Sequence, residues 1–162
     1  VCSSDLMGQK KLLRFNQIKA FSNVFEYPQG VAGRWHDVLH NSNPLVLELA
    51  CGRGEYSVGL ASMFPDTNFM GVDVKGNRIY LGAKKALDTP LPNAFFLRTQ
   101  IEMIAEYFGP GEVKEMWITF PDPQLRTSRA KKRIEFHGET TTRVVYWGLS
   151  SAKYRPFESW ST

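Results

Sequence analysis

The residues with the clearest chemical potential form a glycine-rich turn. The segment Leu47 to Glu55 reads LELACGRGE, in which a short apolar run leads into Gly52 and Gly54. Glycine adopts positive φ without strain and lets a ligand approach the backbone, so the turn is suited to a nucleotide. Asp73 ends the next apolar run, 19 residues beyond Gly54. In an open α/β sheet this spacing places its carboxylate near the ribose hydroxyls of a bound nucleoside.

The details of the turn restrict which nucleotide it can hold. A dinucleotide-binding turn needs a glycine three residues after Gly54, where this chain has Ser57, and the phosphate-loop pattern GxxxxGK[ST] is absent. Glu48, just before the turn, would repel phosphates and favour a cofactor with amino or cationic groups. S-adenosylmethionine has an amino group, a sulfonium, a ribose and no phosphate, and therefore fits. The alternative is an ordinary tight turn with no ligand.

An alternation of strands and helices must position these residues. Four short apolar runs predict buried strands: Leu45 to Ala50, Phe69 to Val74, Ala94 to Leu97 and Met116 to Phe120. The intervening segments carry apolar residues at helical spacing: Tyr56, Leu60, Met63 and Phe64; Ile79, Leu81 and Leu87; Ile101, Ile104, Ala105 and Phe108. This order predicts an α/β fold with a mostly parallel sheet flanked by helices. Such sheets bind ligands at the carboxyl ends of their strands.

Composition limits the class of protein. The 162 residues carry a net charge of +4 and suit a single globular domain. The apolar runs fall far short of the roughly 20 residues that a membrane-spanning helix needs, so no membrane partner is expected. Cys2 and Cys51 form no CxxC pair, and the three histidines show no metal-ligand spacing, so no metal is expected. Two cysteines without a disulfide framework suit a reducing compartment, and the sequence shows no secretory signal pattern. Both observations predict a cytoplasmic location.

Three motifs together resemble the bacterial tRNA (guanine-N7)-methyltransferases. They are ExAxGxG at Glu48 to Gly54, GVDV at Gly71 to Val74, and FPDP at Phe120 to Pro123 followed by a basic run. The glycine turn is common to Rossmann-like methyltransferases, whereas FPDP before a basic run is specific. The resemblance covers about residues 10 to 134. It implies a Rossmann-like class I methyltransferase fold, S-adenosylmethionine as cofactor, and methylation of guanine N7 in the variable loop of tRNA.

The site residues follow from these motifs. The expected cofactor contacts are Glu48, Gly52, Gly54, Asp73, Gln100 and Asp122. Gln100 stands where many relatives have an acidic residue, and its carboxamide can still hydrogen-bond the adenine edge. The expected RNA contacts are Arg126, Arg129, Lys131, Lys132 and Arg133, which would meet phosphates beside the target base. Of these, Arg126 matches a family position that contacts RNA.

Asp122 is the expected catalytic residue. Pro121 and Pro123 fix the backbone on either side of it and present its carboxylate to the cleft. The carboxylate can accept hydrogen bonds from guanine N1 and the exocyclic amine. N7 carries a lone pair and no proton, so its attack on the sulfonium methyl needs no general base. Catalysis would rest on positioning and desolvation.

The two ends of the chain differ from the middle. Residues 1–43 are expected to form an N-terminal basic arm, residues 44–134 the S-adenosylmethionine-binding core, and residues 135–162 an atypical tail of the same single domain. The tail lacks the family's TxFExR motif, so the C-terminal strands are expected to be incomplete, although residues 144–149 predict one strand beside the fourth. An inactive RNA- or cofactor-binding fragment is therefore the alternative function, and the oligomeric state, monomer or homodimer, stays open.

Overall fold

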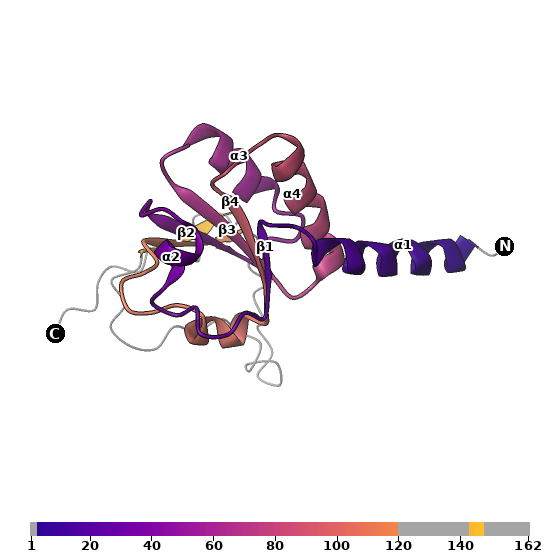
Figure 1. The fold of residues 1–162 in the computed structure, drawn as a ribbon, viewed down its shortest axis with the longest axis horizontal. Helices are drawn as coiled ribbons and strands as arrows, with labels where there is room; N and C mark the ends of the chain where they lie inside the picture. The colour runs from indigo at the N-terminus through magenta and orange to yellow at the C-terminus, as the bar shows by residue number, and fades with distance from the viewer. Residues whose placement is uncertain (1–2, 120–142, 148–162) are drawn as a thin grey trace.

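A six-stranded parallel sheet forms the centre of the molecule. The computed structural model describes residues 3–119 and 143–147, of which residues 3–7, 119 and 143–147 are described by their backbone alone (Figure 1). The strands lie in the order β1-β4-β3-β2-β5-β6, and every neighbouring pair is parallel. Their bounds are β1 Val24–Glu26, β2 Leu45–Leu49, β3 Asn68–Asp73, β4 Ala94–Arg98, β5 Glu115–Thr119 and β6 Arg143–Trp147. The four predicted strands and the predicted pairing of the tail with the fourth are confirmed, whereas β1 was not predicted.

Helices cover both faces of the sheet. Their bounds are α1 Ser3–Ile18, α2 Trp35–Val38, α3 Glu55–Met63, α4 Gly76–Asp88 and the 3-10 helix η1 Ile101–Glu106. On one face the core includes Val58 and Ala61 of α3 and Ile79 and Ala83 of α4. On the other face, Trp35 of α2 packs with residues of η1 and of the segment that follows η1. Because both faces are covered, every residue of β2 and β3 is buried, as is typical of parallel sheets.

Helix α3 buries a different face from the one its apolar residues predicted. Tyr56, Met63 and Phe64 are 40%, 68% and 50% exposed, whereas Ser57, Val58 and Ala61 face the sheet. The reason is steric. The ring of Phe96 fills the space beneath the start of this helix, so close to Gly54 that a Cβ there would overlap it. Only small side chains fit between the helix and the strands at this point.

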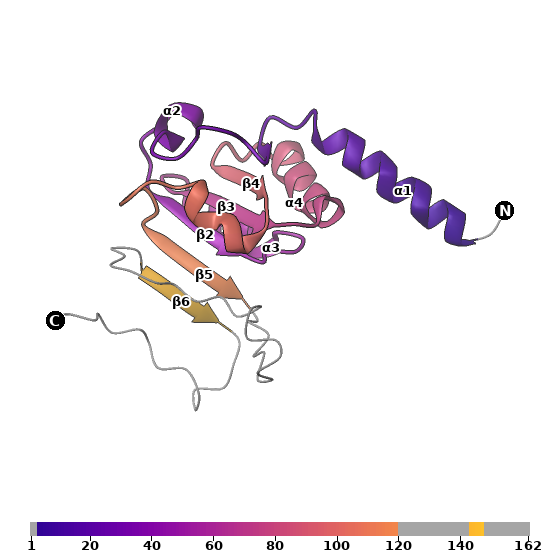
Figure 2. The same ribbon diagram turned by 90° about the horizontal axis from the view of Figure 1, so that it is seen from below.

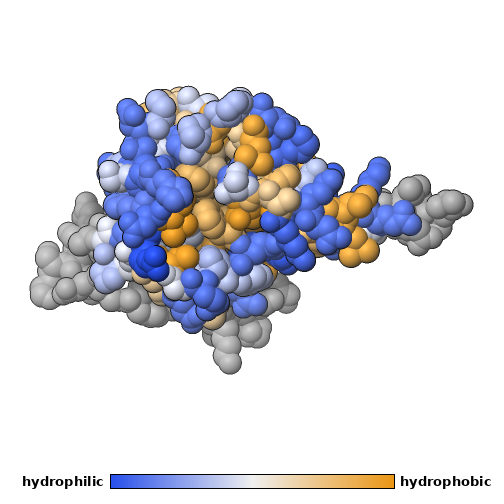
Figure 3. Space-filling model, in the orientation of Figure 1, coloured by the Kyte–Doolittle hydropathy of each residue, from blue (hydrophilic) through white to orange (hydrophobic). Residues whose placement is uncertain are grey.

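The N-terminal segment projects from the body and also contributes to it. Helix α1 extends away from the sheet as a rod (Figure 2), and residues 8–13 are exposed. Hydrophobic side chains stand beside hydrophilic ones along its surface (Figure 3). Its C-terminal end packs on α4, where Ile18 is fully buried. The chain then enters β1, which pairs with β4 at the sheet edge. Residues that were expected to form an arm therefore supply an edge strand.

Two helical glycines offer a matched test of this packing. A Cβ on Gly82 of α4 would overlap the backbone oxygen of Arg53 and lie 2.8 Å from Phe96 Cζ, whereas one on Gly59 of α3 meets nothing within 4 Å. We expect Gly82→Ala to lower the free energy of unfolding by about 1–3 kcal/mol through overpacking. Gly59→Ala should raise it by about 0.5–1 kcal/mol, because alanine favours the helix. Urea titration measures both, and equal effects would contradict the packing described here.

Candidate functional site

The glycine turn leaves the carboxyl end of β2 in a backbone conformation that alternates in sign. Ala50, Gly52 and Gly54 have φ of 56°, 57° and 67°, in the left-handed region. The prediction that Gly52 and Gly54 adopt positive φ is confirmed, and Ala50 adds a residue that rarely does so. The two glycines differ in their surroundings. A Cβ on Gly52 would face open space, so a ligand can approach the main chain there, whereas Gly54 is pressed against Phe96.

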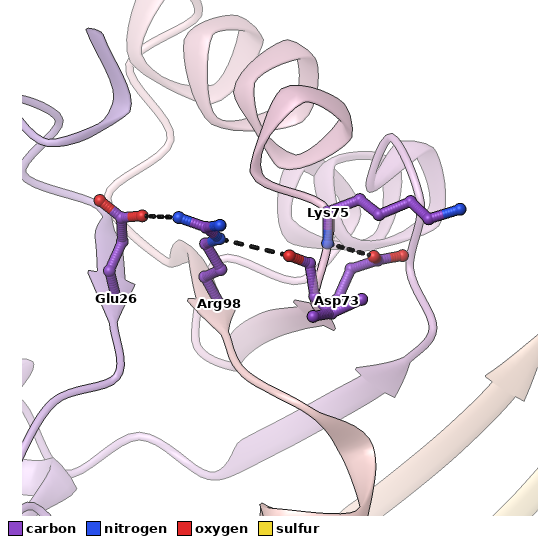
Figure 4. A network of polar contacts seen from close by, with 5 residues as sticks. Glu26, Asp73, Lys75 and Arg98 are labelled. Carbon is purple, nitrogen blue, oxygen red and sulfur yellow. Dashed lines mark hydrogen bonds and ion pairs between the residues drawn. The ribbon is translucent and has the colours of Figure 1, made fainter. Parts of the chain in front are cut away.

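Asp73 joins the glycine turn to the start of α4. Its Oδ2 accepts a hydrogen bond from the Gly52 amide at 3.0 Å. Its Oδ1 accepts one from the Lys75 amide at 2.8 Å (Figure 4). The side chain is buried, at the carboxyl ends of the strands. A carboxylate has about four acceptor positions, so two such bonds fix its orientation and leave capacity for ligand hydroxyls. The structure thus brings together two residues that the sequence placed at one edge.

Glu48 lies under the same turn and holds helix α3. Its Oε2 accepts hydrogen bonds from the Ser57 amide at 2.9 Å and from the Ser57 hydroxyl at 2.6 Å. The carboxylate is buried at the helix N-terminus, where negative charge is stabilised by the helix dipole and unpaired amides. This interaction orients the helix that opens from the turn. The predicted contact of Glu48 with a cofactor amino group stays a prediction.

Cys51 is buried between these two carboxylates. Burial, together with the negative charges of Glu48 and Asp73, raises the pKa of its thiol well above the ordinary value. A Cβ on Gly71 of β3 would lie 2.9 Å from the Cys51 sulfur, so the thiol fills the space left by that glycine. Cys51 is therefore a neutral packing residue at neutral pH.

Gln100 and Thr99 follow β4 at the same edge of the sheet. Gln100 is exposed and precedes η1, while Thr99 is fully buried and donates its amide to the Asp73 carbonyl at 3.2 Å. The Thr99 hydroxyl has no hydrogen-bond partner among the described residues. A buried polar group without a partner costs about 1–3 kcal/mol. Sequence reasoning selected Gln100 and missed Thr99, because no motif marks it.

The remaining predicted residues lie outside the described residues. These are Asp122 and the basic set Arg126, Arg129, Lys131, Lys132 and Arg133. Most of the predicted tail, residues 135–142 and 148–162, also lies outside the described residues, and the expected incompleteness of the C-terminal strands stays a prediction. In the part of the chain that the structure describes, no group of three His, Cys, Asp or Glu side chains could hold a metal ion. Over the same residues, no helix has the length and apolar character needed to cross a membrane.

The described half of the site has a definite chemical character. The buried carboxylates of Glu48 and Asp73 and the open backbone of Gly52 lie at one edge of the sheet. Carboxylates accept hydrogen bonds from hydroxyl and amino groups and repel phosphate oxygens. The edge therefore suits a nucleoside with ribose hydroxyls and a cationic or amino-bearing substituent, and it does not suit a phosphate-rich nucleotide.

Comparison with known proteins agrees with a site for a nucleoside that carries a cationic or amino-bearing substituent. A family model described as "Putative methyltransferase" matches residues 42–144. The chain is 47% identical over 137 residues to a tRNA (guanine-N(7)-)-methyltransferase of Bacteroides fragilis, covering 79% of this chain and 54% of that protein. It is 45% identical over 132 residues to one of Cytophaga hutchinsonii, covering 79% and 60%. The chain thus spans between half and two thirds of the length of these curated relatives.

A solved structure supports the fold assignment. The antibiotic-resistance methyltransferase Kmr superposes with a TM-score of 0.51 at 24% identity, covering 57% of this chain and 49% of Kmr. This likeness concerns the fold alone. The expected α/β architecture, a parallel sheet flanked by helices in the manner of Rossmann-like class I methyltransferases, is confirmed.

The raised pKa of Cys51 predicts how stability depends on pH. The unfolded thiol ionises near pH 8.5, while the folded thiol keeps its proton to higher pH, so the folded state binds more protons in between. The contribution of the Cys51 thiol to the free energy of unfolding is complete below about pH 8.5. It is lost as the pH rises, by up to about 1.4 kcal/mol per pH unit. The stability difference between a Cys2→Ser protein and its Cys51→Ala derivative should therefore narrow between pH 8.5 and 10 in urea titrations. A difference independent of pH would contradict the buried neutral thiol.

Proposed function

The chain belongs to the methyltransferase family whose model matches residues 42–144, and from that membership we propose that it transfers a methyl group from S-adenosylmethionine to N7 of a guanine in tRNA. The observation that carries the proposal is the Asp73 carboxylate. It is held by the Gly52 and Lys75 amides beside an open stretch of glycine backbone. Relatives at 45–47% identity that bear the name of this activity support the choice of substrate.

The described residues fit S-adenosylmethionine. When bound, this cofactor supplies an electrophilic methyl group on a sulfonium. Asp73 would accept hydrogen bonds from the ribose hydroxyls, Gly52 would admit the ligand to the main chain, and Gln100 would bind the adenine edge. Glu48 would place negative charge near the amino group and the sulfonium.

The proposed chemistry depends on position. N7 of neutral guanine holds an available lone pair and no proton, so no side chain has to remove one. Asp122 would accept hydrogen bonds from guanine N1 and the exocyclic amine and so orient N7. Excluding water and aligning the two reactants would then provide most of the rate enhancement. We place this reaction in the cytoplasm, where tRNA is found.

A methyl-transfer assay tests the proposal directly. The full chain is incubated with methyl-tritiated S-adenosylmethionine and an unmodified tRNA transcript, and labelled 7-methylguanosine is measured. We expect Asp122→Ala to reduce transfer by about a hundredfold or more, because the base loses its orientation, while most cofactor affinity remains in calorimetry. Asp66→Ala, in the exposed turn before β3, is the matched control and should have no effect.

The outcomes separate the candidate functions. Full activity of Asp122→Ala would refute the role of this carboxylate. Cofactor binding without transfer by the unchanged chain would instead support the alternative, a cofactor- or RNA-binding fragment. That alternative has a physical basis, because the chain spans about half the length of several relatives.

The basic run predicts a salt-dependent interaction with tRNA. Each phosphate neutralised by Lys or Arg releases counterions and contributes about 0.7–0.9 to the slope of log affinity against log salt concentration. Replacing Lys131, Lys132 and Arg133 with alanine should reduce that slope by about 2–3 in filter-binding or fluorescence titrations.

A control with the same loss of charge makes this result specific. The variant carries alanine at Lys84 and Lys85 of α4 and at Lys114, all exposed; Lys114 precedes β5, whereas FPDP follows that strand. Its slope should stay close to that of the unchanged chain. If the slope fell equally in both variants, net charge rather than a localised contact would govern tRNA binding.

A further inference from the structure

Arg98 connects three strands at the edge of the sheet where the candidate site lies. It ends β4 and is in register with Glu26 of β1 on one side and Asp73 of β3 on the other. Its Nη1 forms an ion pair with Glu26 Oε2 at 2.5 Å, with the two side chains 23% and 18% exposed. Its Nε donates to the Val74 carbonyl at 3.2 Å (Figure 4). One guanidinium thus links the edge strand to the residue after Asp73.

Aromatic rings hold the guanidinium from α1 and from the end of β1. Arg98 Cζ lies 4.8 Å from the centroid of the Phe15 ring and 5.6 Å from that of Tyr27. Tyr27 adopts a φ of 45° and donates its amide to the Arg98 carbonyl at 3.2 Å. A guanidinium is planar and has five donors, so it can stack and form two separate polar contacts at once, which an ammonium cannot do equally well.

Helix α1 also touches the other end of the same loop. Gly76, the first residue of α4, lies so close to α1 that a Cβ would come within 2.8 Å of Ile18 Cδ1 and 2.9 Å of Phe15 Cε1. The loop between β3 and α4 is therefore braced at Val74 by Arg98 and at Gly76 by α1. Between these two points the Lys75 amide donates to Asp73 Oδ1.

We propose that Arg98 and Phe15 are positioning residues that hold the Val74–Gly76 loop, and through it the Asp73 carboxylate, in the orientation that binds the cofactor ribose. This inference rests on the proposed function. One of the two amides that orient the carboxylate belongs to the loop, so a loop that moves releases one side of it. In metal sites, replacing a residue that orients a ligating side chain typically changes affinity by about 10–100-fold, and we take the lower end of that range as the expectation for Asp73.

The test combines cofactor affinity with loop protection. Arg98→Met keeps most of the side-chain stem and removes the guanidinium, and Phe15→Ala removes the stacking ring from α1. We expect each to weaken binding of S-adenosylhomocysteine about tenfold in calorimetry. Without ligand, amide hydrogen exchange in a peptide covering Val74–Arg78 should become faster. Lys84→Met, which removes the exposed Lys84–Asp88 pair of α4, is the control and should change neither measurement.

Arg98→Lys separates positioning from simple stability. Lysine can keep the ion pair with Glu26, so a purely electrostatic contribution would leave thermal stability, affinity and exchange unchanged. We expect near-normal thermal stability with weakened affinity and faster loop exchange, because one ammonium cannot stack on Phe15 and reach both acceptors. Unchanged affinity and exchange in Arg98→Met and Phe15→Ala would overturn the inference. Failure of the unchanged chain to bind S-adenosylhomocysteine would overturn the proposed function instead, while loop exchange would still report on the brace.

Discussion

The packing of the Phe96 ring determines how closely the elements around the site approach one another. The ring is fully buried in β4 and lies against Gly54 of the turn, Gly71 of β3 and Gly82 of α4. Each of these positions lacks room for a Cβ. Three glycines from three separate elements therefore accommodate one aromatic side chain. Because protein interiors are close-packed, this arrangement fixes the height of α3 and α4 above the sheet and so the place where the glycine turn emerges.

The polar contacts of the site depend on that close approach. With the turn drawn down onto β3, the Gly52 amide comes within 3.0 Å of Asp73 Oδ2, and Glu48 comes within reach of the first turn of α3. Both carboxylates therefore already accept hydrogen bonds from backbone amides of the protein. A ligand with hydroxyl groups would meet acceptors that are already oriented, which lowers the entropic cost of binding. The same residues explain the shape of the turn and carry the ligand that we propose for it.

The parts of the fold that the sequence predicted depend on local patterns. Apolar runs identified β2 to β5, and the spacing of Gly52, Gly54 and Asp73 placed them at one edge, because parallel strands end together. The parts it missed depend on contacts between distant residues. Glu26 and Arg98 are 72 positions apart. Strand β1 has three residues and no alternating pattern of its own, and the buried face of α3 is set by Phe96.

The N-terminal segment shows why such contacts matter to function. An edge strand of three residues gains little from its own hydrogen bonds, so β1 needs further support to remain in the sheet. That support comes from the ion pair of Glu26 with Arg98 and from α1, whose Ile18 is fully buried against α4. Both contacts also reach the loop that follows Asp73. A segment whose composition predicts a basic arm is therefore part of the framework of the candidate site. Removing it would expose both the edge of β4 and the loop that follows Asp73.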